Sequence, residues 1–120
     1  MESYKLVLPE HLNHYGYLFG GNMLMWIDEV SWIAASRDFP GCKFVTVAMD
    51  RVEFRKSVRQ GSVLRFVVDR ADMGRTSVRY RVEVFCDDIE SGAEDLVFAT
   101  TVTFVCLDAH GNKTVISGNE

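Results

Sequence analysis

Several features that define other protein classes are missing from this sequence. No apolar run approaches the roughly 20 residues that cross a bilayer, so membrane insertion is not expected. The three cysteines form no C-x-x-C pair and no apolar secretory segment opens the sequence, which together indicate a reducing, cytoplasmic setting. His11 and His14 lie in a predicted loop without further ligands nearby, so no bound metal is expected.

Positive charge is in deficit overall and concentrated locally. The formal net charge of −4 argues against non-specific nucleic-acid binding by the whole molecule. Residues 51–81 nevertheless carry nine Lys or Arg against three Asp or Glu, a local charge of +6, while the remainder carries −10. A basic segment in an acidic protein indicates a small anionic ligand, such as a phosphate-bearing cofactor. Solvated, outward-facing positions of a sheet explain it equally well.

One long helix and several strands are predicted. Residues 3–8 favour a short strand, and residues 9–19, which contain Pro, Asn, His and Gly, favour a loop. From Gly20 to about Asp38, apolar residues recur at three- and four-residue spacing, which predicts a helix that Pro40-Gly41 ends. Further strands are predicted over residues 44–54, 62–72, 76–86 and 96–107.

The order of these elements predicts a single α+β domain over residues 1–120. One strand, one long helix and then four strands in a meander form a curved antiparallel sheet that wraps the helix. The wide apolar face of the helix favours burial inside such a sheet. Because one helix covers only one side and a long apolar edge invites pairing, we expect at least a dimer with a continuous sheet. The tail from Thr114 is expected to be loose.

The run from Asn13 to Glu29 combines the parts that chemistry at a carbonyl group needs. Gly20 and Gly21 open the apolar helix, so the N–H groups of its first turn are free and its positive end is accessible. Asp28 lies two turns further along, where a carboxylate among apolar neighbours is costly unless it is partnered or used. The run therefore predicts hydrogen-bond donors and a base or nucleophile in one short segment.

This run resembles the hotdog-fold acyl-CoA thioesterases, in particular the acyl-CoA hydrolase branch. The shared pattern is an Asn, a Gly three residues later, an aromatic residue before Gly-Gly, and Asp-Glu within an apolar helix. Two positions depart from the family pattern, with Ser57 where Pro is usual and Ser62 where an acidic residue is usual. Further matching runs are Val45-Thr46-Val47-Ala48-Met49-Asp50, Phe54 with Gly61, Gly74-Arg75-Thr76-Ser77, and Thr103-Phe104-Val105 with Asp108 and Gly111.

The resemblance implies hydrolysis of an acyl-CoA thioester to a free acid and coenzyme A. Asp28 is the implied general base for water, or the nucleophile that forms a mixed anhydride, and Glu29 is the reserve candidate. Gly20, with Gly21 beside it, is the implied oxyanion donor through its backbone N–H. Asn13 is expected to hold the attacking water or to orient the thioester. The family arrangement is a composite site, with Asn13 and Gly20 from one subunit and Asp28 from the other.

Coenzyme A, as part of the substrate, is the implied ligand of the basic segment. Phosphate groups favour Arg or Lys together with hydroxyl and backbone donors. No metal or redox cofactor is implied, and the implied assembly is a homo-oligomer, from a dimer up to a hexamer built as a trimer of dimers. The candidate residues for coenzyme A are Arg55, Lys56, Gly74, Arg75, Thr76 and Ser77.

Two other functions are compatible with these residues. A hotdog hydratase or dehydratase acting on enoyl thioesters would need His11 or His14 as its base. A non-catalytic acyl-CoA sensor would bind the same ligand without turnover. An assay of enoyl-CoA with His→Ala variants separates the first from a thioesterase, and binding without turnover identifies the second.

Overall fold

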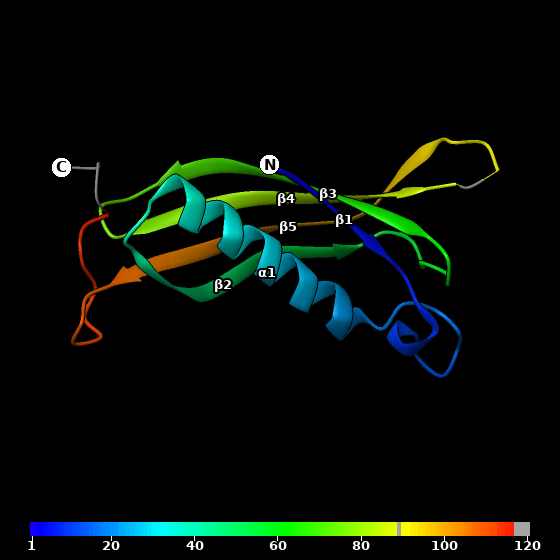
Figure 1. The fold of residues 1–120 in the computed structure, drawn as a ribbon, viewed down its shortest axis with the longest axis horizontal. Helices are drawn as coiled ribbons and strands as arrows, with labels where there is room; N and C mark the ends of the chain where they lie inside the picture. The colour runs from blue at the N-terminus through cyan, green and yellow to red at the C-terminus, as the bar shows by residue number, and fades with distance from the viewer. Residues whose placement is uncertain (89, 117–120) are drawn as a thin grey trace.

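One helix and five strands make up the fold (Figure 1), and a computed structural model describes residues 1–88 and 90–116. All the predicted elements are present with boundaries within two residues, which confirms the α+β class. No helix in the described part of the chain combines the length and apolarity of a membrane span. The elements are β1 (Glu2–Leu6), the 3-10 helix η1 (Pro9–His11), α1 (Gly20–Asp38), β2 (Lys43–Phe54), β3 (Val63–Met73), β4 (Ser77–Asp87) and β5 (Glu94–Leu107).

The five strands form one antiparallel sheet in the order β1-β3-β4-β5-β2. Only β3, β4 and β5 form a meander, whereas β2 lies at the far edge and pairs with β5. The predicted four-strand meander is therefore wrong at its first step. The connection over residues 55–62 is too long for a tight hairpin turn and crosses the end of the sheet instead. β1 occupies the position beside β3 that a meander would give to β2.

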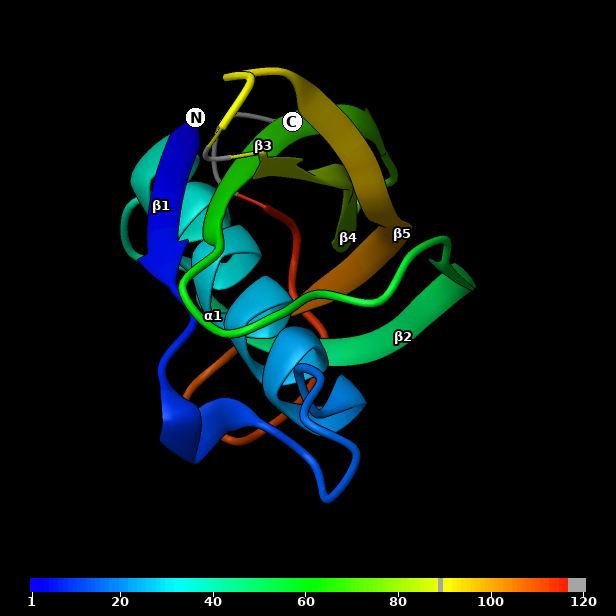
Figure 2. The same ribbon diagram turned by 90° about the vertical axis from the view of Figure 1, so that its right-hand side faces the viewer.

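The sheet curls around α1, which lies on its concave face (Figure 2). The helix buries Met23, Trp26, Ile27 and Val30 against the strands, as its periodicity predicts. On β4, every second side chain from Val78 to Val84 points into the same core. The buried residues of that strand are Val78, Tyr80, Val82 and Val84.

Both ends of α1 depend on backbone geometry. The helix begins after Phe19, whose backbone is extended and whose side chain makes no capping hydrogen bond. At its C-terminal end, the N–H of Phe39 donates to the carbonyl of Ala35, and the chain reverses at Gly41 with a φ of +92°. Pro40 and Gly41 therefore stop the helix as predicted.

The segment after β5 is ordered as far as the structure describes it. The N–H of Ile116 donates to the carbonyl of Arg75 at 2.9 Å, and the Ile116 side chain is fully buried. The predicted loose tail is therefore wrong for Thr114–Ile116, because one apolar side chain closes the end of the core. Residues 117–120 lie outside the described part of the chain.

β2 is an edge strand with two interruptions in its pairing to β5. The register shifts between Thr46 and Ala48 and again between Asp50 and Glu53. Within the second interruption, Arg51 has a φ of +54°, in the left-handed region that a residue with a Cβ rarely adopts. Bulges of this kind re-aim the side chains that follow them.

Part of the basic segment is paired on the outer face of the sheet. Arg79 lies 3.8 Å from the carboxylate of Asp50 and 3.6 Å from that of Asp72. Arg65 pairs with Glu2 at 2.6 Å and with Glu94 at 2.9 Å, which links three strands. These two arginines therefore have carboxylate partners without any ligand.

One buried hydroxyl ties the end of α1 to the sheet. The Tyr80 hydroxyl donates to a carboxylate oxygen of Asp38 at 2.6 Å. Burial is the main cause that raises the pKa of Tyr80 above its ordinary value of 10, and the hydrogen bond to Asp38 adds to it.

Replacement of this tyrosine has an effect on stability that depends on pH. At pH 7 we expect Tyr80→Phe to lower the free energy of unfolding by about 1 kcal/mol, the size of one hydrogen bond. Above pH 10 the unfolded wild type loses the Tyr80 proton while the folded form keeps it, so wild-type stability falls and the difference shrinks. Urea unfolding of both proteins from pH 7 to 11 measures this. A difference that stays constant across that range contradicts it.

Candidate functional site

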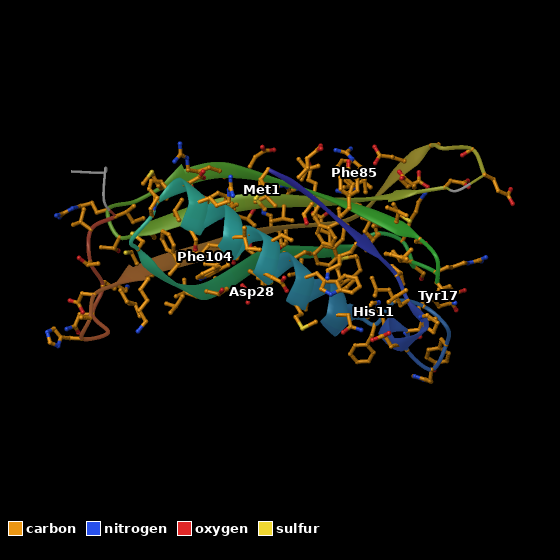
Figure 3. The ribbon with its side chains drawn as sticks, in the orientation of Figure 1. Met1, His11, Tyr17, Asp28, Phe85 and Phe104 are labelled. Carbon is orange, nitrogen blue, oxygen red and sulfur yellow. The ribbon has the colours of Figure 1, made fainter. Side chains whose placement is uncertain are left out.

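A cleft of about 570 Å³ opens where α1 begins, at the end of the molecule that carries His11 and Tyr17 in Figure 3. Three parts of the chain form it: the loop before α1 with the first turn of the helix, the segment that leaves β2, and the start of β5. Its lining residues are Asn13, Tyr15, Tyr17, Leu18, Gly20, Met23, Phe54, Arg55, Lys56, Ser57, Val58, Val97 and Phe98.

The cleft has an apolar floor and a polar rim. Met23, Val58, Val97 and Phe98 are buried members of the hydrophobic core, so the floor is the core itself. Asn13, Arg55 and Lys56 supply the polar groups. A concave apolar surface with a few convergent polar groups is the usual form of a small-molecule site.

Asn13 uses one side of its amide to hold the loop. Its Oδ1 accepts the backbone N–H groups of Tyr15 at 2.9 Å and of Tyr17 at 3.1 Å. Gly16 completes the turn with a φ of +85°, which its missing Cβ permits. The Nδ2 group has no acceptor among the described residues, so Asn13 presents a hydrogen-bond donor to the cleft.

The first turn of α1 supplies a second donor. The carbonyl of Phe19 accepts the N–H groups of Asn22 at 3.0 Å and of Met23 at 3.4 Å. In the described part of the chain the N–H groups of Gly20 and Gly21 have no acceptor, and of the two residues only Gly20 lines the cleft. A Cβ on Gly20 would stand 3.2 Å from the Phe54 ring, so the glycine permits this close approach.

Asp28 lies elsewhere, half-buried near the middle of the helix (Figure 3). Its Oδ1 accepts a hydrogen bond from the Thr46 hydroxyl at 2.5 Å. It lines a separate hollow of about 300 Å³ together with Met25, Glu29, Trp32 and Thr46. A single chain therefore brings Asn13 and Gly20 together and leaves Asp28 apart from them.

The predicted coenzyme A residues also fall into two groups. Arg55 and Lys56 stand at the rim of the cleft, paired with Glu53 at 2.7 Å and with Asp95 at 3.2 Å. Gly74–Ser77 form the turn between β3 and β4, where Ser77 pairs with Val105. The cleft reaches β5 at Phe98, which is seven residues before Val105 on the same strand. Seven residues of strand span about 23 Å, so the two groups are about that far apart within a single chain.

The histidines have structural surroundings. His11 Nδ1 accepts the N–H of Leu8 at 2.9 Å, and the ring packs edge-on against Trp26 with centroids 4.8 Å apart. His14 packs against Tyr15. Neither histidine lines the cleft, which disfavours a histidine base.

The cysteines are not built for nucleophilic chemistry either. All three are free, and burial raises the pKa of Cys106 to about 11. Cys106 lies in the core, whereas Cys86 is only half-buried, near the end of β4.

Sequence reasoning missed the role of Thr46. The residue stands in the run Val45–Asp50, but nothing in the sequence places it beside Asp28, eighteen residues earlier. The contact arises because β2 lies next to α1 at the sheet edge, and strand pairing decides that position.

The profile of the thioesterase superfamily matches residues 15–93. An acyl-CoA thioester hydrolase of Bacillus subtilis, itself uncharacterized, is 31% identical over 112 residues, which are 92% of this chain and 63% of that protein. The chain thus spans less than two thirds of the length of that relative.

Two solved structures superimpose closely on this fold. Acyl-CoA hydrolase from Staphylococcus aureus, in complex with butyryl coenzyme A, coenzyme A and coenzyme A disulfide, has a TM-score of 0.88 at 30% identity over 97% of this chain and 70% of its own. A hexameric broad-specificity acyl-coenzyme A thioesterase has a TM-score of 0.88 at 28% identity over 98% and 88%. The Staphylococcus enzyme was also solved with alanine replacing an aspartate and, separately, an asparagine fifteen residues earlier.

The two hydrogen bonds accepted by Asn13 predict a difference between two variants. Asn13→Ala removes the acceptor and is expected to lower the free energy of unfolding by about 0.5–1 kcal/mol. Asn13→Asp keeps an oxygen in the same place and should leave stability unchanged. Urea unfolding of both variants measures this, and equal destabilisation by the two would contradict the assigned orientation of the amide.

Proposed function

This chain belongs to the thioesterase superfamily, and from that premise we propose that it hydrolyses acyl-coenzyme A thioesters at a site shared between two copies. The observation that carries the proposal is the pair of free donors in one cleft, the Nδ2 of Asn13 and the N–H of Gly20. Attack on a thioester puts negative charge on the carbonyl oxygen. Donors aimed at that oxygen stabilise the charge and lower the barrier.

Asn13 acts as a donor in this proposal. Because its Oδ1 already accepts two backbone N–H groups, the amide oxygen is not available to accept a hydrogen bond from the attacking water. Its Nδ2 instead joins the Gly20 N–H at the thioester carbonyl. Of the two roles expected for Asn13, orientation of the thioester is therefore the one we propose.

Asp28 acts in this proposal either as a general base that takes a proton from the attacking water or as a nucleophile that attacks the thioester carbonyl. The Thr46 hydroxyl holds its Oδ1 and leaves the other carboxylate oxygen for the reaction. In both cases water ends up in the acid product and the CoA thiol leaves. The spacing between Asn13 and Asp28 is fifteen residues, equal to that between the two residues replaced in the Staphylococcus enzyme.

Pairing of β2 with its own copy brings the two halves together. A two-fold axis at Asp50 places Thr46 of one copy opposite Phe54 of the other, four residues to either side of the axis. Thr46 contacts Asp28, and Phe54 packs against Gly20. In that register Asp28 of each copy faces the donors of the other.

The face that such pairing covers is apolar and exposed in one copy. Met25 and Val47 are 56% and 55% exposed, and Trp32 and Val52 are also exposed. They lie on α1 and on the unpaired edge of β2. Burial of this surface supports dimerisation.

The same pairing supports one binding site for coenzyme A. It places the partner's turn of residues 74–77 at the same end of the continuous sheet as Arg55 and Lys56. From β2 that turn is reached three strands away, past the partner's β2 and β5, at the start of the partner's β4. That separation is about 14 Å. We propose that Arg55 and Lys56, with Arg75, Thr76 and Ser77 from the partner's turn, hold its phosphate groups. Gly74 shapes that turn, since its N–H donates to the carbonyl of Ser77 at 2.9 Å.

The proposed assembly is a hexamer built as a trimer of such dimers, in line with the hexameric thioesterases that share this fold. Three free thiols in one small domain support a reducing, cytoplasmic compartment.

A substitution at Asp28 tests the chemistry. In Asp28→Asn the amide oxygen still accepts from Thr46, so folding is preserved while the base or nucleophile is lost. We expect kcat for acyl-CoA hydrolysis to fall about 10²- to 10⁴-fold. Free-thiol release from acyl-CoA substrates measures this, and Glu29→Gln, one residue away, is the matched control.

The other results of this assay are equally informative. If Glu29→Gln is the variant that loses activity, Glu29 replaces Asp28 as the base. If the wild type binds acyl-CoA without turning it over, the protein is a binding or sensor protein and the hydrolase proposal is wrong.

Mixed dimers test the shared site. Asn13→Asp and Asp28→Asn subunits are each expected to be inactive alone. In a mixed dimer, one of the two sites combines the intact Asn13 of one subunit with the intact Asp28 of the other. Random mixing therefore restores about a quarter of the wild-type sites. If the mixture is as inactive as its components, the two residues act within one chain.

A further inference from the structure

We propose that Phe54 is the residue that sets the length of acyl chain the cleft accepts, an inference that rests on the proposed thioesterase function. Phe54 is the last residue of β2, and its side chain lines the cleft, 58% exposed in a single copy. No catalytic role is assigned to it, since its ring carries no proton to give or take.

The two donors orient the substrate in the cleft. With the thioester carbonyl at Gly20 and Asn13, the coenzyme A portion extends along the rim towards Arg55 and Lys56. The acyl chain then has the apolar part of the cleft left to it. That part is floored by Met23, Val58, Val97 and Phe98 and walled on the β2 side by Phe54.

The Phe54 ring stands where a growing acyl chain would need room. It packs edge-on against the fully buried Phe98, with ring centroids 4.7 Å apart. The ring also packs closely against the start of α1, since a Cβ added at Gly20 would lie 3.2 Å from a ring carbon of Phe54. The ring thus fills the corner between the helix and β5, directly beside the proposed position of the carbonyl.

The backbone before Phe54 fixes the direction of the ring. The register shift between Asp50 and Glu53, with Arg51 in the left-handed region, comes three residues before it. Pairing resumes at Glu53 and Phe54, with Phe54 directly opposite Phe98. The bulge therefore sets the direction in which the ring leaves the strand, and in that position it forms a side wall of the cleft.

Phe19 provides a matched control for this wall. It is 55% exposed and packs against Gly21 as Phe54 packs against Gly20, with a Cβ-to-ring distance of 3.1 Å. It does not line the cleft. Loss of its ring removes a similar exposed aromatic contact at the same helix start without enlarging the site.

The experiment compares wild type, Phe54→Ala and Phe19→Ala on straight-chain acyl-CoAs from acetyl to palmitoyl. For the wild type and Phe19→Ala we expect kcat/KM to fall once the chain reaches the ring. For Phe54→Ala the chain enters the vacated corner, and each added methylene there raises kcat/KM about fourfold, the effect of burying one CH₂. Size-exclusion chromatography checks that all three share one oligomeric state.

A binding measurement separates this inference from the proposed function. Ketone analogues of acyl-CoA, with a methylene between carbonyl and sulfur, keep the carbonyl but cannot be hydrolysed. A preference for longer analogues gained only by Phe54→Ala supports the wall even if the wild type turns over no substrate, in which case the hydrolase proposal alone fails. The inference is overturned if Phe54→Ala keeps the wild-type chain-length profile in rates and binding, or if Phe19→Ala changes it equally.

Discussion

Burial of one face of α1 against the concave sheet is the constraint from which the rest of the molecule follows. Met23, Trp26 and Ile27 are anchored in the core, which fixes both the axis and the rotation of the helix. With the rotation fixed, the N–H of Gly20 points to the cleft and Asp28 points to the hollow beside β2. The positions of the proposed catalytic groups are therefore set by apolar packing rather than by contacts between the polar groups themselves.

Two local features lower stability where function needs them. Helix starts are usually capped by a side chain, which contributes about 1 kcal/mol, yet Phe19 makes no such bond and leaves two N–H groups open. Arg51 adopts a left-handed conformation that costs an ordinary residue of the order of 1 kcal/mol or more. The uncapped helix start lies at the cleft, and Arg51 comes three residues before Phe54, which lines it. Natural sequences concentrate such departures from ideal local structure at functional sites.

Most of the secondary structure could be predicted from the sequence, and the long-range pairing could not. The 20–38 helix has a clear period and the strong stop at Pro40-Gly41, so both boundaries were predictable. Strand periodicity says which residues face the core but not which strand is the neighbour. That is why the place of β2 and the contact of Thr46 with Asp28 were missed. Ile116 was missed because two adjacent apolar residues, Val115 and Ile116, show no period that would reveal which of them is buried.

The proposed site is divided between two surfaces of one chain, which in this proposal links catalysis to assembly. Asn13 and Gly20 offer donors with no base beside them, and Asp28 offers a carboxylate with no substrate cleft. Each half is exposed to water in a single copy, where donors and carboxylate are solvated and interact weakly with anything else. In the dimer that we propose, pairing along β2 removes that water from both halves at once. The exposed apolar surface that the pairing would cover, Met25 and Trp32 among it, would then also strengthen the interactions of the polar groups.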